Sequence, residues 1–176
     1  MANRMAHRIW DLDSLGIISS KPVFIHGYVF YPNQQADAAQ FVYWDENDTP
    51  AAQSIGVTYT NTDSTDTTVT STGNFASTWA DGKVAKITKT TGSDTGKYGL
   101  IKTAGNNNAF VTHLMPFTTE ASKVGDFYCY TTYNALKLKH PNDTNEEGKF
   151  VLVNFLFPNL ALDSLSTSAG ITLYIG

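Results

Sequence analysis

Two long runs of hydrophobic residues, one near each end of the chain, dominate the sequence pattern. Residues 150–157 read Phe-Val-Leu-Val-Asn-Phe-Leu-Phe and precede Pro158, which cannot continue the hydrogen-bond ladder of a strand. Because successive side chains of a strand point to opposite faces, this run would be apolar on both faces, which predicts a buried strand at the centre of a sheet. Phe155 is accordingly expected to be buried, so that an aspartate there should prevent folding. Residues 23–31 form a similar run, also ending in an aromatic residue followed by Pro-Asn, so we predict that both ends of the chain share one core.

Shorter segments of alternating polarity accompany these runs. Residues 9–18 alternate between apolar and polar positions, residues 41–44 lead into a turn rich in acidic residues, and residues 171–175 alternate again. Such alternation is typical of strands with one buried face. We therefore predict an outer β-sandwich, jelly-roll-like, formed by the N- and C-terminal strands of residues 1–57 and 132–176.

The middle of the chain, residues 58–131, predicts a separate unit. Residues 55–73 are rich in threonine, which is β-branched and polar and suits exposed strands; we expect a hairpin, with its tip at residues 61–66, that projects without building core. Residues 75–130 contain short strands separated by glycine and asparagine turns, which favours a small β-barrel or meander. The chain is therefore expected to be all-β, with this small β module inserted between the strands of the outer sandwich.

Composition supports strands and limits the classes of function. Of the 176 residues, 41% are hydrophobic and only 16% are charged, whereas surface helices need more charge. The formal net charge is -4 and the basic residues are scattered, so we expect no nucleic-acid partner. No apolar run follows the basic residues near the start, so we expect no signal peptide, no membrane partner, and synthesis in a cytoplasm. The single Cys129 excludes an internal disulfide and a multi-cysteine zinc site.

No group of residues has the spacing of a metal site or a catalytic centre. The histidines are scattered through an arm, a core strand, a strand end and a loop: His7, His26, His113 and His140. The acidic residues at 11–13 and 45–48 fit solvated turns better than a calcium loop. There is no G-x-S-x-G elbow, the glutamates cannot be paired from sequence as glycosidase carboxylates, and Cys129 lies in an aromatic strand where a buried thiol is ordinary. We therefore expect no catalytic residue, no metal and no cofactor, and predict that the protein is not an enzyme.

The candidate residues for contact with a partner are Arg4, His7, Arg8, Trp44 and Trp79. Tryptophan builds protein interfaces and sugar-stacking platforms, but core burial is the commoner role of a large aromatic residue, and we favour it for both tryptophans. The basic arm of residues 1–8 could lie along an acidic neighbour or could be disordered, and both interpretations stay open.

Two stretches of the chain resemble structural proteins of tailed-bacteriophage particles. The outer segments read Arg-Ile-Trp-Asp-Leu-Asp-Ser-Leu-Gly-Ile-Ile-Ser at 8–19, Pro-Val-Phe-Ile at 22–25, Val-Phe-Tyr-Pro at 29–32 and Ile-Thr-Leu-Tyr-Ile-Gly at 171–176. They are similar to small virion proteins that open with an R-I-W-x-L-D-x-x-G-x-[IV]-S pattern and end on a short apolar strand. The inserted module resembles a β module recurrent in phage structural proteins at Phe75, Trp79, Asp81, Gly82, Val84, Ile87, Asp94, Gly96, Tyr98 and residues 117–121. The threonine-rich segment departs from this pattern.

The resemblance implies a structural part of the virion that carries no catalytic residues. We expect a decoration or cement protein, made in the host cytoplasm, that binds and stabilises the head shell as a homo-oligomer, a trimer. Its partners would be the major capsid protein or other virion proteins. The alternative is a tail or adsorption protein that binds host surface glycan through exposed aromatic residues, and an enzyme acting on polysaccharide is a more distant one.

Overall fold

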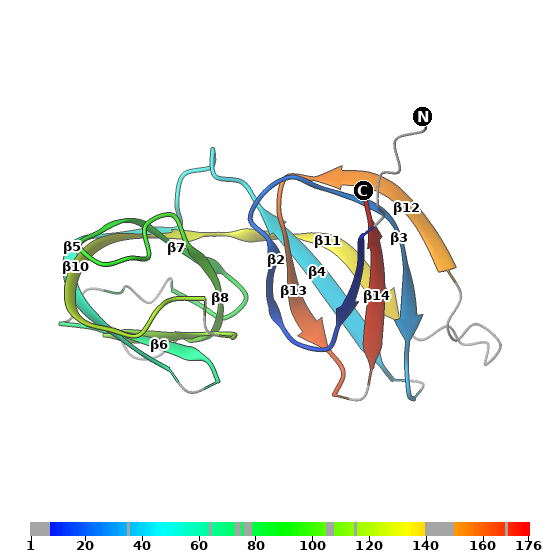
Figure 1. Ribbon diagram of the computed structural model, residues 1–176, viewed down its shortest axis with the longest axis horizontal. Helices are drawn as coiled ribbons and strands as arrows, with labels where there is room; N and C mark the ends of the chain where they lie inside the picture. The colour runs from blue at the N-terminus through cyan, green and yellow to red at the C-terminus, as the bar shows by residue number, and fades with distance from the viewer. Residues whose placement is uncertain are drawn as a thin grey trace. The chain divides into compact units, whose positions relative to one another are not determined.

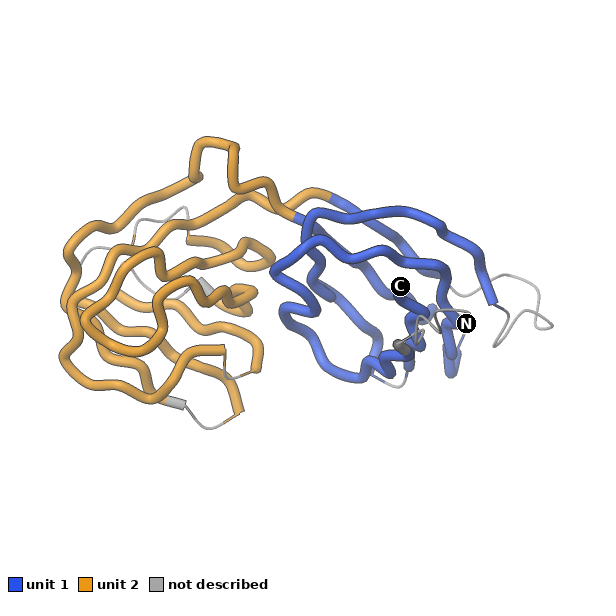
Figure 2. Tube along the Cα trace, turned by 45° about the horizontal axis from the view of Figure 1, so that its top comes forward, with its two compact units in different colours: residues 1–43, 134–176 blue, residues 44–133 orange. Residues whose placement is uncertain are grey.

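The computed structural model describes residues 8–34, 36–63, 65–72, 75, 79–104, 108–114, 116–139, 150–167 and 169–176. These residues form strands and turns, and they include no helix that is long and apolar enough to cross a membrane. The chain divides into two compact units, residues 1–43 with 134–176 and residues 44–133 (Figure 2). The all-β class and the presence of an inserted unit are as predicted. The insert begins at Trp44, however, and not at residue 58.

Two four-stranded sheets form the first unit (Figure 1). One sheet has the order β1-β14-β3-β12, and the other has the order β11-β4-β13-β2. The strands are β1 (Arg8–Leu12), β2 (Gly16–Ser19), β3 (Val23–Tyr31), β4 (Ala38–Trp44), β11 (Thr132–Lys139), β12 (Phe150–Phe157), β13 (Leu160–Leu165) and β14 (Gly170–Ile175). Consecutive strands alternate between the sheets, except that β4 and β11, which flank the insert, are neighbours in one sheet. This connectivity is a jelly roll, as the sequence led us to expect.

The core of the jelly roll lies between the two sheets and receives side chains from both. Strand β3 begins with alternating buried and partly exposed positions, as a strand with one inward face requires. Ile25 of β3 is fully buried, as are Leu173 of β14 in the same sheet and Phe41 and Leu162 of the opposite sheet. Burying each such side chain stabilises the fold by about 1.5–3 kcal/mol. The two ends of the chain therefore share one core, as predicted.

Strand β12 departs most from expectation, because it lies at the edge of its sheet and not at the centre. Phe157 is buried at 5% exposure and Val153 is partly buried against the core, but the other five apolar side chains of the strand are exposed. Their exposed fractions are 50% for Phe150, 42% for Val151, 65% for Leu152, 56% for Phe155 and 57% for Leu156. The expectation that Phe155 is buried is wrong. The strand is apolar on both faces, but the fold of the described residues does not cover it.

Six strands close into a barrel in the second unit, in the order β10-β5-β6-β9-β8-β7, and β7 pairs back to β10. They are β5 (Ala52–Asp63), β6 (Thr67–Ser71), β7 (Val84–Thr90), β8 (Tyr98–Ala104), β9 (Ala109–Thr112) and β10 (Glu120–Tyr130). Aromatic rings fill much of the interior: the Phe75 ring lies 4.9–5.4 Å, centroid to centroid, from the rings of Trp79, Phe110 and Phe127. The barrel therefore has a core of its own.

The threonine-rich segment forms two neighbouring strands of this barrel. β5 and β6 make the predicted hairpin, but Val57, Tyr59 and Val69 are at most 2% exposed and belong to the barrel core. Threonines 58, 60 and 62 alternate with the buried positions and point outward. The prediction that this segment projects without building core is therefore wrong, because only one of its two faces is threonine-rich. The pairing of β5 with β10 also explains why the insert begins before residue 58.

Candidate interaction surface

A register shift in the pairing of β12 with β3 determines which side chains of β12 point to the inner face of the sheet and which to the outer face. Leu152 lies opposite Gly27 and Phe155 lies opposite Ile25, so β12 has one more residue than β3 between these two pairs. Asn154 occupies this bulge with a φ of 47°, a left-handed conformation that asparagine adopts more readily than most residues. Residues directly opposite one another share a face, so Phe155 points to the same side as the buried Ile25. Leu152 points to the outer face.

The outer face of this sheet carries an apolar patch along β12, formed by Phe150, Leu152 and Leu156. The ring of Phe150 lies across the sheet, with its centroid 5.1 Å from that of Tyr174 on β14. Gly27, on the intervening strand β3, makes this approach possible, because a Cβ there would lie 2.3 Å from the Phe150 ring. The patch is therefore built by specific packing and not by a loose strand.

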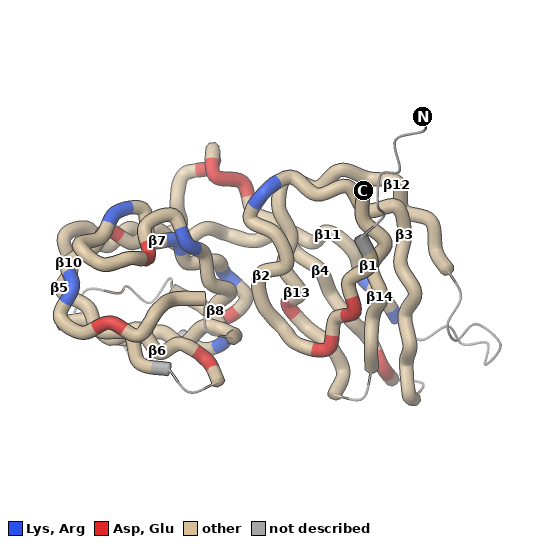
Figure 3. The backbone as a smooth tube through the Cα atoms, viewed as in Figure 1, with Lys and Arg blue, Asp and Glu red and all other residues tan. Residues whose placement is uncertain are grey.

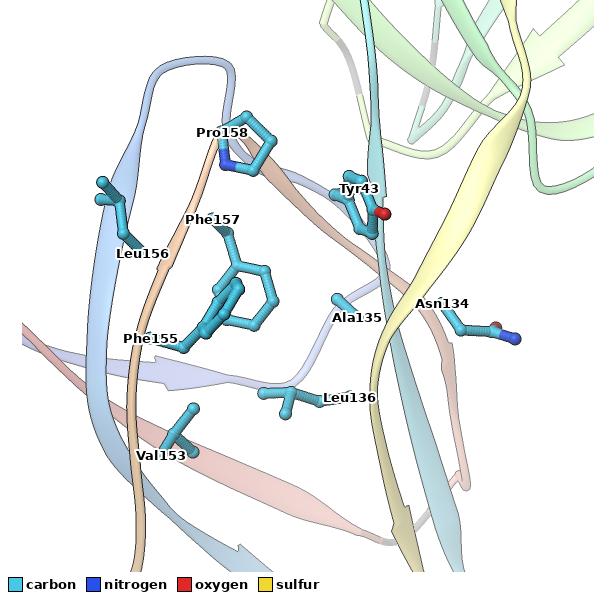
Figure 4. A pocket seen from close by; sticks show the side chains of 9 residues that line it. All are labelled: Tyr43, Asn134, Ala135, Leu136, Val153, Phe155, Leu156, Phe157 and Pro158. Carbon is cyan, nitrogen blue, oxygen red and sulfur yellow. The ribbon is translucent and has the colours of Figure 1, made fainter.

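An apolar groove runs along the inward side of β12 (Figure 4). It has a volume of about 530 Å³ and lies between β12 with Pro158 on one side and β4 with β11 on the other. Phe155 and Phe157 form one wall with ring centroids 4.8 Å apart, and Leu136 lies opposite them. The polar side chains that line the groove are those of Tyr43 and Asn134. Because no carboxylate, histidine or cation is among its lining residues, the groove suits the binding of an apolar group.

The other edge strands of the jelly roll carry protection that β12 lacks. An edge strand exposes unpaired N–H and C=O groups, and natural proteins protect such edges by charge, proline or short length. Strand β2 has 4 residues, β1 contains Asp11, and β11 contains Lys137 and Lys139. Strand β12 has 8 residues and no charged side chain, as Figure 3 shows. It is therefore the edge best suited to pair with another strand.

No family model, curated protein or solved structure matches the chain.

The structure buries both tryptophans that the sequence offered for partner contact. Trp44 is fully buried, with its ring 5.6 Å from that of Tyr98, and Trp79 is 1% exposed inside the barrel. Neither indole presents a face to a partner, so the interaction role is wrong for both and the core role holds. Arg4 and His7 lie outside the described residues, and the structure describes the backbone of Arg8, at the start of β1, but not its side chain.

The remaining candidates for chemistry have structural partners. Among the described residues, no three histidine, cysteine, aspartate or glutamate side chains come together as a potential metal site. Asp11 accepts a hydrogen bond from the Thr172 hydroxyl at 2.6 Å, and Asp48 accepts one from the Tyr133 hydroxyl at 2.6 Å. Burial raises the pKa of Cys129 to about 12, which keeps the thiol protonated and unreactive.

Two charged clusters in the barrel were not found from the sequence. Glu46 accepts hydrogen bonds from both Lys86 and Tyr98. Burial lowers the pKa of Lys86, but the contacts of Lys86 with Glu46 and Tyr98 outweigh burial and leave that pKa raised. Asp94 is fully buried, accepts a hydrogen bond from the Thr118 N–H at 2.8 Å and pairs with a cation, Lys97. The first cluster joins a loop to strands β7 and β8, and the second joins two loops. Asp94 and Lys97 are three residues apart, but Thr118, and the partners of Glu46, come from distant segments, so no spacing in the sequence signals these contacts.

Proposed function

We propose that this protein is a structural component of a tailed-bacteriophage particle, and specifically a decoration or cement protein that binds and stabilises the head shell. The observation that carries the proposal is strand β12: an uncharged edge strand with exposed apolar side chains on both faces. The largest apolar patch on a typical monomer is about 300–600 Å² and is often functional. A subunit of an assembly needs such a surface, and a free monomer does not.

Three further points support this assignment. Residues 8–19 and the inserted module resemble phage virion proteins. The jelly roll is also an architecture of viral capsid and lectin domains, although a fold alone does not determine a function. The groove beside β12 is apolar, which suits a binding role better than a catalytic one.

The glycan-binding alternative requires exposed aromatic residues, and its candidates were Trp44 and Trp79. Trp44 is 0% exposed and Trp79 is 1% exposed, so neither can stack on a sugar ring. Phe150 and Phe155 are exposed, but they lie on an uncharged edge strand that suits a protein partner, so we favour the decoration role.

The test is to locate the protein on particles of the phage that encodes it. Particles purified by density gradient are analysed by quantitative mass spectrometry and by cryo-electron microscopy. We expect the protein in many copies per particle, as density on the outside of the head. Absence from purified particles would contradict the proposal, and a position on the tail would contradict the decoration role.

A further inference from the structure

We propose that β12 is the self-association surface of this protein, and that its edge is covered by β12 of a second copy in an antiparallel pair. This inference rests on the proposed function and deepens it, because it names the surface through which the subunits contact one another. The product is a dimer in which the sheets β1-β14-β3-β12 of two copies form one continuous sheet.

The backbone of β12 is paired on one side. Within the described part of the chain, β12 pairs with β3 alone, so one row of its N–H and C=O groups has no strand partner. Pairing of two edges satisfies such groups in both chains at once. The other edges of the jelly roll are short or carry charges, so they are poorer partners for this strand.

The side chains of β12 suit a second copy of the same strand as its partner. Residues 150–157 contain no charged side chain, so two copies of the strand meet without like-charge repulsion. Antiparallel pairing about a two-fold axis brings the same apolar row of each copy onto a common face. With the axis near residue 154, Leu152 of one copy lies opposite Leu156 of the other, and Leu156 lies opposite Leu152.

The exposed apolar area of β12 can be compared with the area that a specific interface buries. The five exposed side chains of β12 are 42–65% exposed, and a large apolar side chain presents on the order of 200 Å² when free. Together they present roughly 500 Å² in each copy, or about 1,000 Å² for two copies, which is the lower limit for a specific interface. This sum is an upper limit, because a strand paired at the edge covers each face only in part, so the interface is small and the expected dimer depends on concentration.

A two-fold contact closes with two copies, so this inference replaces the expected trimer by a dimer. It also means that one residue of β12 lies opposite its own counterpart. A cysteine near that position can form a disulfide across the axis, whereas the buried Cys129 stays unreactive.

The experiment compares the intact chain with matched lysine variants. Leu152→Lys and Leu156→Lys place a charge on the edge strand, and Ile55→Lys, at a position 60% exposed on β5 of the barrel, is the control. Circular dichroism and thermal unfolding establish that each variant folds. Sedimentation equilibrium should show a dimer for the natural chain and the control, and a dissociation constant at least tenfold larger for the two β12 variants. A variant that combines Leu152→Cys with Leu156→Cys, tested with Ile55→Cys under mild oxidation, should form covalent dimers, because residue 152 of one copy lies opposite residue 156 of the other; Ile55→Cys should form none.

A monomer at all concentrations, a trimer, or a dimer unaffected by both lysine variants would each overturn the inference. The particle assay separates this result from the proposed function. If the natural chain is monomeric but Leu152→Lys no longer enters particles, β12 contacts another virion protein; the inference fails and the proposed function stands. If the dimer depends on β12 but the chain is absent from particles, the proposed function fails and the pairing of β12 stands.

Discussion

Phe155 and Phe157 make a matched pair of residues on one strand, with the same chemistry and different burial. Phe157 is 5% exposed and Phe155 is 56% exposed. We expect Phe157→Ala to lower the free energy of unfolding by about 3–5 kcal/mol and Phe155→Ala to lower it by about 1 kcal/mol or less. Urea unfolding at concentrations low enough to keep the chain monomeric measures both values. Equal losses would mean that Phe155 is buried after all.

The same pair shows what the sequence can and cannot predict about a residue. The pattern of residues 150–157 indicates correctly that both faces of the strand are apolar. It does not tell whether the cover comes from the same chain or from a partner, because the hydrophobic effect depends on the apolar area removed from water and not on the molecule that removes it. The threonines of β5 pose a similar problem: high polarity on one face concealed the alternation that puts Val57 and Tyr59 in the barrel core.

At the scale of the element, the absence of a side chain at Gly27 allows β12 to pack closely against β3. A Cβ at this position would lie 2.4 Å from the backbone oxygen of Val151 and 2.3 Å from the Phe150 ring, so the two strands would have to separate. We expect Gly27→Ala to cost about 1–3 kcal/mol in stability and to speed hydrogen exchange of the β12 amides. Gly170→Ala is the control, because a Cβ there meets nothing within 4 Å. Unchanged exchange in β12 would show that Phe150 does not pack across Gly27.

The groove is an element-scale feature that the sequence pattern could not predict. Leu136 and Phe155 come from the consecutive strands β11 and β12, whereas Tyr43 comes from β4, which lies before the insert. Their proximity follows from the order of strands in two sheets, and periodicity carries no information on that order. Periodicity did predict the strands themselves, since alternation and branched side chains act locally.

At the scale of the whole molecule, the insert enters and leaves the jelly roll at two neighbouring strands. β4 and β11 are adjacent in their sheet, and the Gln40 side-chain amide donates a hydrogen bond to the Asn134 side-chain oxygen at 2.8 Å. The chain therefore leaves the sheet and returns to it at adjacent positions, as it would through a long hairpin loop. Each unit also has a core of its own, since the jelly-roll cluster and the barrel cluster share no residue.

This arrangement predicts that the two units fold independently. Replacing residues 44–133 by a short glycine-containing linker should leave a jelly roll that unfolds cooperatively, because shortening such a connection changes the closure free energy by only about 2 kcal/mol. That fragment should keep the β12-dependent dimer.

Residues 44–133 alone should also unfold cooperatively, since the barrel is closed and has no edge to cover. Tryptophan fluorescence follows each fragment separately, with Trp10 in the first and Trp44 and Trp79 in the second. In the intact chain, Phe110→Asp should unfold the barrel and leave the dimer intact. If this variant abolishes the dimer, or if either fragment unfolds without cooperativity, the jelly roll depends on its insert, and association through β12 is not a property of the jelly roll alone.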